Sequence, residues 1–104
     1  MSTPAVKEED FTNAVNILGD AYTLHIVDKL SSKSLRFNEL QRSIADICPA
    51  TLTDRLKKLE QEQIVTRQEE TVDKVSVVYE LTPKGKGVLP IIKAINNFAK
   101  NFGA

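Results

Sequence analysis

The residues best suited to chemistry lie in one segment, DICPATLTDRLKKLEQEQIV, which covers residues 46–65. Its polar positions carry hydroxyl groups at Thr51 and Thr53, a guanidinium group at Arg55 and an ammonium group at Lys58. Hydroxyl groups can bind phosphate oxygens or base edges, arginine can form two parallel hydrogen bonds to a guanine, and lysine can pair with a phosphate. These side chains could together contact a nucleic acid if the backbone placed them on one face.

A helix over this segment would bring the polar side chains together. Leu52, Leu56 and Leu59 recur at helical spacing and predict the buried stripe of a helix over about residues 49–62. Pro49 suits the first turn of this helix, where no amide hydrogen is needed. The outward arc is then expected to hold Ala50, Thr51, Asp54, Arg55 and Lys58.

The acidic residue on this arc leaves two interpretations open. Asp54 would be repelled by phosphate, so it either accepts a hydrogen bond from a cytosine amine or positions Lys57 or Lys58. Alternatively, the arc is a solvated face on which Asp54 and Lys58 pair one turn apart. These residues taken alone favour the solvated face, whereas a helix that follows a tight turn favours the nucleic acid.

Cys48 is the only cysteine, and it stands at the predicted N-cap of the same helix. A helix N-terminus lowers the pKa of a thiol and raises its reactivity, so Cys48 is a candidate redox-sensitive residue. The other interpretation is a small, partly buried cap with a structural role only. One cysteine cannot form an internal disulfide, which fits a reducing cytoplasm.

The chain has 104 residues, with 14 basic and 14 acidic side chains, as expected for one compact domain without net charge. The charges are unevenly distributed. Residues 33–58 hold six basic and three acidic side chains, whereas residues 59–80 hold two basic and six acidic ones. A local basic excess suggests a face that meets a polyanion, although charge alone favours ordinary solvated helix faces.

Several classes of function find no support in the sequence. His25 is the only histidine, and no constellation of serine, cysteine or carboxylate residues accompanies it, so a partly buried structural histidine is expected rather than a catalytic or metal site. No cofactor motif is recognisable. No apolar run is long enough to cross a bilayer, and residues 1–10 contain no hydrophobic signal region. We therefore expect a cytoplasmic protein that is not an enzyme and has no membrane partner.

The order of the elements predicts a fold. Helices are expected over residues 9–18, about 20–30, 37–45 and 49–62, with a short extended piece at Leu35–Arg36. Alternating residues then predict a hairpin, the wing, over about 64–81. The last helix should start at Thr82 as N-cap, run to about Phe102 and be kinked by Pro90. The result is a single winged helix-turn-helix domain over 1–104, mainly α with a small β-hairpin, with the helix-turn-helix at 37–62 and a flexible start at 1–8.

Four ordered motifs resemble the HxlR-type winged helix-turn-helix transcription regulators, which are relatives of the MarR group. They are LGDAYTLHIVDKL, LRFNELQRSI, CPATLTDRLKKLEQEQIVTR and VYELTPKGKGVLPIIKAI. The resemblance implies a dimeric DNA-binding regulator without enzymatic activity, whose first and last helices form the dimer. The chain departs from the family pattern at Ala21–Tyr22, where Lys-Trp is usual, at Gln63, where glycine is usual, and at Ser76 in the wing, where arginine is common. The N-terminal cysteine that many relatives use as a sensor is missing from EEDFTNAV.

In this architecture the fourth helix enters the major groove, and other residues hold the phosphate backbone of double-stranded DNA. Backbone contacts are expected from Arg36, Asn38 and Arg42, each of which could equally be an ordinary surface residue, and a light one from Lys74 at the wing tip. The full set of expected DNA-contacting residues is Arg36, Asn38, Arg42, Pro49, Ala50, Thr51, Thr53, Asp54, Arg55, Lys58 and Lys74.

The last helix carries more apolar residues than one face of a single chain can bury, which predicts a homodimer on a pseudo-palindromic operator. The expected interface residues are Phe11, Val15, Leu18, Leu89, Ile91, Ile92, Ile95, Phe98 and Phe102. Packing within one chain is the alternative for these residues. The alternative function is a winged-helix dimer that binds a protein partner, for which the neutral total charge and the acidic wing would speak.

Overall fold

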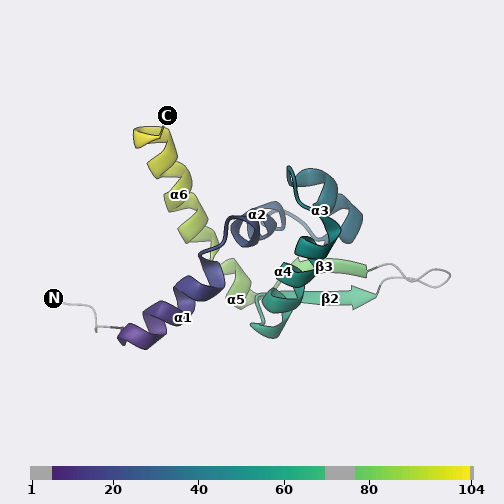
Figure 1. The fold of residues 1–104 in the computed structure, drawn as a ribbon, viewed down its shortest axis with the longest axis horizontal. Coiled ribbons are helices and arrows are strands. Elements are labelled where there is room, and N and C mark those ends of the chain that lie inside the picture. Colours follow the sequence, from purple (N-terminus) through teal and green to yellow (C-terminus); the bar gives the residue numbers. More distant parts are fainter. Residues whose placement is uncertain (1–5, 70–76, 104) are drawn as a thin grey trace.

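The computed structural model describes residues 6–69 and 77–103. Nine elements follow one another in the described residues (Figure 1): α1 (Glu8–Leu18), α2 (Ala21–Lys29), β1 (Leu35–Arg36), α3 (Phe37–Ser43), α4 (Pro49–Gln61), β2 (Val65–Glu69), β3 (Val77–Leu81), α5 (Pro83–Lys86) and α6 (Leu89–Phe102). The predicted order is confirmed as far as the wing, and the predicted last helix is divided into α5 and α6. Of the residues expected to be flexible, Glu8 already belongs to α1 and residues 1–5 lie outside the described part, as do Lys74 and Ser76.

The core forms where α2, α3 and α4 meet the sheet. The predicted stripe of Leu52, Leu56 and Leu59 is at most 1% exposed, and Ile26 and Leu40 are fully buried. Full burial of such side chains contributes about 1.5–3 kcal/mol each. Because the leucines anchor one side of α4 in this core, its other side is left at the surface.

The sheet has three antiparallel strands in the order β1-β3-β2, one more than the predicted hairpin. The short piece Leu35–Arg36 pairs with β3, so that Leu35 lies opposite Tyr79. On the other side of β3, Val65 lies opposite Leu81. The predicted alternation holds, because Tyr79 and Leu81 are buried and Glu80 is exposed.

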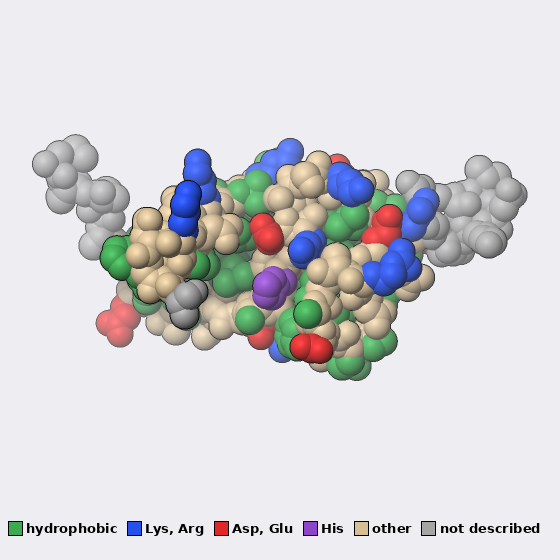
Figure 2. Space-filling view, turned by 90° about the horizontal axis from the view of Figure 1, so that it is seen from above, with side chains coloured by type: hydrophobic (Ala, Val, Ile, Leu, Met, Phe, Trp, Pro, Cys, Tyr) green, Lys and Arg blue, Asp and Glu red, His purple; other side chains and the backbone are tan. Residues whose placement is uncertain are grey.

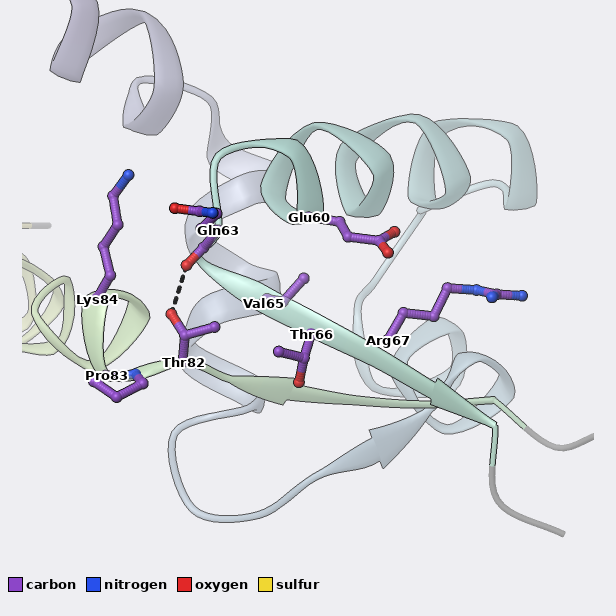
Figure 3. A pocket seen from close by; sticks show the side chains of 8 residues that line it. All are labelled: Glu60, Gln63, Val65, Thr66, Arg67, Thr82, Pro83 and Lys84. Carbon is purple, nitrogen blue, oxygen red and sulfur yellow. Dashed lines mark hydrogen bonds between the residues drawn. The ribbon is translucent and has the colours of Figure 1, made fainter.

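A tight corner joins α4 to β2. Gln63 has φ 62°, in the left-handed region that favours glycine. The N–H of Ile64 donates to the carbonyl oxygen of Leu59 at 2.9 Å, and that of Gln63 donates to Glu60 at 3.0 Å, which is the Schellman arrangement. The Thr82 hydroxyl donates to the Gln63 carbonyl oxygen at 2.6 Å (Figure 3). Gln63 therefore forms a left-handed cap at the position where the family usually has glycine, and Thr82 ties this cap to the start of α5.

The C-terminal part contains two helices, α5 and α6, where a single kinked helix was predicted. Thr82 is the N-cap of α5 as expected, and its hydroxyl oxygen accepts from the Gly85 N–H at 2.9 Å. The break lies at Gly87 and Val88 rather than at Pro90. Pro90 has no N–H to donate to the Lys86 carbonyl, and its ring would clash with that group, so the helix ends there and α6 restarts with Pro90 in its first turn.

Two helices project from the body of the domain. In Figure 1, the wing strands β2 and β3 extend on one side of the domain, and α1 and α6 project from the opposite side. The two helices diverge from each other. No residue of α1 is buried, and Ile92 is the only buried residue of α6. In the part of the chain that the structure describes, every helix is too short or too polar to span a bilayer.

Candidate nucleic-acid interface

Helix α4 presents a polar face to solvent. Cys48 is its N-cap and Pro49 stands in its first turn, as predicted. Among the residues expected on this face, Thr51 is half-buried and the following are exposed: Pro49, Ala50, Thr53, Asp54 and Lys58. Small residues in the first turn allow the helix to approach a groove closely, and the hydroxyl of Thr53 is accessible for a hydrogen bond. The exposure expected of these residues from their helical spacing is therefore observed, with Thr51 only half-exposed.

Arg55 lies differently from its prediction, because two carboxylates hold its side chain. Its Nε donates to Asp20 at 2.9 Å and its Nη1 donates to Asp54 at 2.7 Å. Only 28% of the side chain is exposed. The prediction placed Arg55 on the outward arc of α4. In the structure Arg55 lies nearer to the buried leucine stripe, where its side chain can reach the start of α2. The bond from Arg55 lowers the pKa of Asp20 to about 2, with help from Thr23, and both carboxylates raise the pKa of Arg55.

The lysines considered from sequence are not the side-chain partners of Asp54 in the structure. Asp54 binds Arg55, the next residue, rather than Lys57 or Lys58. The ammonium group of Lys58 donates instead to the backbone carbonyl of Asn16, at the end of α1, at 3.3 Å. The i, i+4 pair on a solvated face is therefore absent from the structure, and α4 is bonded to both α1 and α2.

Two cations that the sequence analysis did not select, Lys57 and Arg67, border a groove between α4 and the sheet. Thr53, Lys57 and Glu60 line it from α4, and Arg67 and Tyr79 line it from β2 and β3. Figure 3 shows Glu60 reaching from α4 towards β2 and Arg67 extending below the same helix. Helical spacing places Lys57 on the outer arc beside Asp54, so its position was available from sequence. The position of Arg67 depends on how the sheet packs against α4.

The other predicted backbone contacts come from α3 and its N-cap residue. Arg36, Asn38 and Arg42 are exposed there. The backbone N–H of Arg36 donates to the Glu39 carboxylate at 2.8 Å, which caps the helix. Lys74 lies outside the described residues. The surface that includes α4 therefore extends over the start of α3 and, across the groove, to Arg67.

Cys48 is exposed rather than a partly buried cap. Its Sγ lies 3.2 Å from the Thr51 hydroxyl oxygen. The hydrogen bond with the Thr51 side chain lowers the pKa of the Cys48 thiol, and the backbone amides of Thr51 and Ala50 add to this effect. Hydrogen bonds to the thiolate favour the charged form, which is the nucleophile.

His25 is exposed, in contrast to the partly buried histidine expected from sequence. Within residues 6–69 and 77–103, no group of three or more histidine, cysteine or carboxylate residues could hold a metal ion.

An apolar surface lies at the opposite end of the domain, on the projecting helices. Ile91, Ile95, Phe98 and Phe102 follow one another at i, i+4, i+7 and i+11 on α6 and are 44–75% exposed. The rings of Phe98 and Phe102 lie 5.4 Å apart. Figure 2 shows hydrophobic side chains at the end of the molecule that these helices form. On α1, Phe11 is 64% and Val15 is 47% exposed.

Three other residues expected at the interface are partly or fully covered by the chain itself. Leu18 and Leu89 are half-buried and pack against the core. Ile92 is a core residue with 9% exposure, because α6 turns this side towards α2. Little of the Ile92 side chain is therefore left for a second copy, which corrects its assignment from sequence.

Comparison with known proteins gives one consistent family. Residues 17–104 match the sequence model described as HxlR-like helix-turn-helix. The uncharacterized HTH-type transcriptional regulator YvaP of Bacillus subtilis is 36% identical over 89 residues, which cover 86% of this chain and 82% of that protein. HTH-type transcriptional regulator YodB of the same species is 33% identical over 90 residues, or 86% of this chain and 80% of YodB.

Solved structures of relatives have the same fold. A structure described as a MarR-family transcriptional regulator from Porphyromonas gingivalis W83 matches with TM-score 0.85 and 29% identity, over 97% of this chain and 99% of that one. The reduced form of YodB matches with TM-score 0.79 and 31% identity, over 98% and 95% of the two chains. The exposed polar face of α4 beside the sheet is consistent with these sequence and structural similarities. The chain belongs to the HxlR-like helix-turn-helix family of DNA-binding transcriptional regulators.

Proposed function

We propose that two copies of this chain bind a pseudo-palindromic site in double-stranded DNA and regulate transcription, with α4 in the major groove of each half-site. The observation that carries this proposal is the exposed polar face of α4, which begins with small residues and leads to Lys57 and Lys58. The family and the names of its curated members support regulation of transcription rather than the binding of a protein partner. A protein with this task works in the cytoplasm, where the chromosome lies in organisms such as Bacillus subtilis, and has no catalytic activity.

Residues of α4 divide between base contacts and backbone contacts. Ala50, Thr51 and Thr53 stand in the first turns, the part of a recognition helix that reaches base edges. Asn38 and Arg42 of α3 would bind phosphates, and so would Lys58 through the ammonium hydrogens that are not bonded to Asn16. Asp54 is tied to Arg55, so it offers only its remaining oxygen to a cytosine amine.

Lys57 and Arg67 would bind one DNA strand between α4 and the wing. They stand on opposite walls of the groove described above, and both are exposed. A sugar-phosphate strand carries one negative charge per nucleotide, which suits two facing cations. Glu60 on the same groove opposes a closer approach and limits this contact to the rim.

The apolar surface on α1 and α6 would hold the two copies together. Ile91, Ile95, Phe98 and Phe102 form a seam at spacings of four, three and four residues, the pattern by which two helices pack side by side. Aromatic side chains at such a seam commonly dominate the binding free energy. A twofold axis through this seam would present two α4 helices to DNA.

The DNA proposal is tested by selecting duplexes from a random pool with the wild-type protein and measuring affinity by fluorescence anisotropy at several salt concentrations. Affinity should fall steeply as salt rises, because binding releases counterions. Lys57→Ala and Arg67→Ala should each weaken binding to all sequences and reduce the salt slope by about one. Lys93→Ala, on α6 away from α4, should leave the affinity for DNA and the salt slope unchanged. Failure to enrich any sequence, or affinity that salt does not affect, would contradict the proposal.

The dimer is tested by sedimentation of single-residue variants. Phe98→Glu places a charge in the proposed seam and should shift the protein to the monomer. Asn97→Glu introduces the same charge at the neighbouring exposed residue, which faces away from the seam, and should remain dimeric. A wild-type protein that sediments as a monomer at micromolar concentration would rule out this interface.

A further inference from the structure

Asp20 holds two helices at once. It is the N-cap of α2, and its carboxylate accepts hydrogen bonds from the Thr23 N–H at 2.9 Å and from the Thr23 hydroxyl at 3.1 Å. The same carboxylate accepts from Nε of Arg55 at 2.9 Å and from Nη2 at 3.3 Å. The start of α2 is thereby bonded to the middle of α4, across 35 positions of sequence.

A second bond reaches α4 from the end of α1. The ammonium group of Lys58 donates to the backbone carbonyl of Asn16. Arg55 and Lys58 are three residues apart and so lie on the same side of α4. The two bonds therefore hold one side of the recognition helix against the junction of α1 and α2.

The junction itself has little freedom. Gly19 alone separates α1 from Asp20, and its N–H donates to the Val15 carbonyl oxygen at 2.6 Å. A β-carbon on Gly19 would lie 2.5 Å from that oxygen, so the backbone turns back tightly on the end of α1. A fixed Asp20 therefore also fixes the direction in which α1 leaves the domain.

This direction bears on how a dimer meets DNA. Helix α1 carries Phe11 and Val15, which belong to the surface proposed to bind a second copy. In such a dimer the angle between α1 and α4 sets the separation of the two recognition helices. That separation has to match the spacing of the half-sites along the duplex.

We propose that Asp20 is a positioning residue for DNA recognition, which acts through Arg55 to set the half-site spacing that the dimer reads. The inference rests on the proposed function. Asp20 lies outside the helix-turn-helix and was not among the residues that the sequence indicated for DNA contact. The proposal also assigns Arg55 a different role: the guanidinium is committed to Asp20 and Asp54 and orients α4, rather than reading a guanine.

The variant Asp20→Ser separates the two roles of this side chain. Serine caps a helix about as well as aspartate, so α2 keeps its N-cap, whereas the ion pair with Arg55 is lost. The probes are duplexes enriched by the wild-type protein, with the segment between the half-sites lengthened or shortened by one or two base pairs. We expect Asp20→Ser to bind the original spacing about three- to tenfold more weakly, and to discriminate less among the altered spacings.

Two controls isolate the ion pair. Asp28→Ser removes an exposed carboxylate from the same helix α2 and corrects for the general gain in attraction to DNA that follows loss of a negative charge. In an Arg55→Met background, Asp20→Ser should have no further effect on spacing preference, because the partner is already gone. If Asp20→Ser fails to fold by circular dichroism, Asp20→Asn replaces it, since asparagine also caps the helix and carries no charge.

A folded and dimeric Asp20→Ser protein with wild-type affinity and wild-type spacing preference would overturn the inference and leave the proposed function intact. Tighter binding by Asp20→Ser than by Asp28→Ser would also overturn it, because the released Arg55 would then be contacting DNA. If the wild-type protein enriches no duplex at all, the proposed function itself fails, and this inference with it.

Discussion

A β-carbon on Gly85 would lie 2.1 Å from the carbonyl oxygen of Ile64. Helix α5 is thus packed directly against the corner between α4 and β2, where the Thr82 N–H also donates to the Ile64 oxygen at 3.0 Å. The obstructing atom belongs to the backbone and cannot rotate away. The position at Gly85 accepts no side chain, because the corner that orients the wing relative to α4 occupies the space.

Replacing Gly85 by alanine should therefore destabilise the domain. We expect Gly85→Ala to lower the free energy of unfolding by about 2–3 kcal/mol, because either the corner or α5 has to move. Urea unfolding followed by circular dichroism measures this change. Gly87→Ala is the matched control: its nearest backbone oxygen lies 3.0 Å away and its φ of −65° suits alanine, so a change within about 1 kcal/mol is expected. Equal losses in the two variants would contradict the steric explanation.

Gln63, the left-handed residue at the end of α4, gives a prediction of increased rather than decreased stability. Gln63→Gly should raise the free energy of unfolding by about 1 kcal/mol, because glycine adopts a φ of 62° without a steric penalty. Gln63→Val should lower it, since a β-branched side chain resists this conformation most. The midpoints of urea unfolding measure both effects, provided that the dependence of the unfolding free energy on urea concentration is the same in each variant. A Gln63→Gly protein that is less stable than wild type would show that the glutamine side chain makes a compensating contact.

The lowered pKa of Asp20 predicts that the protein loses stability in acid. Arg55 and Thr23 lower the pKa of Asp20 from 3.8 to about 2, so its contribution to stability is fully present above about pH 4 and is lost as pH falls towards 2. More than a third of the side chain is exposed, and solvent screening limits the contribution to about 1 kcal/mol or less. The difference in unfolding free energy between wild type and Asp20→Asn should shrink across this pH range. A difference that does not change with pH would exclude the ion pair as its source.

Cys48 should react faster than an ordinary cysteine at neutral pH. The hydrogen bond from Thr51 lowers the pKa of its thiol, so the rate of alkylation by iodoacetamide should reach half its maximum at a lower pH than for free cysteine. Thr51→Val should move this midpoint upwards, whereas Thr53→Val, which alters a different exposed part of α4, should not. Identical profiles for wild type and Thr51→Val would refute the assigned cause.

The redox hypothesis for Cys48 is a separate question and has its own test. If Cys48 senses oxidants, treatment with peroxide should weaken DNA binding by the wild-type protein and leave Cys48→Ser unaffected. An unchanged response in Cys48→Ser would end the hypothesis.

Much of the fold could be predicted from sequence because its signals are local. The stripe of Leu52, Leu56 and Leu59 determined both the extent of α4 and its buried side. Thr82 was recognisable as an N-cap, since capping depends on a few consecutive residues, whereas Gln63 was noted only because the family usually has glycine there. The break before α6, at Gly87 and Val88, lies two to three residues ahead of Pro90, where the kink was predicted, because a proline disturbs the preceding turn rather than its own.

The candidate site was harder to predict because its contacts are long-range. Nothing in the sequence near Arg55 or Asp20 indicates that they meet, and a single arginine on a helix was more readily interpreted as a DNA contact. The groove that joins Lys57 to Arg67 depends on the packing of the sheet against α4. Ile92 likewise became a core residue only because α6 packs on α2.

The strand order β1-β3-β2 has a consequence for how copies of this protein can associate. Both outer strands have an open edge, and open edges can recruit strands from other molecules into continuous sheets. Here β1 has only two residues, and β2 carries the charged side chains of Arg67 and Glu69. Such edges resist aggregation through the sheet. The proposed self-association would thereby be directed to the projecting helices, where it can form a closed pair.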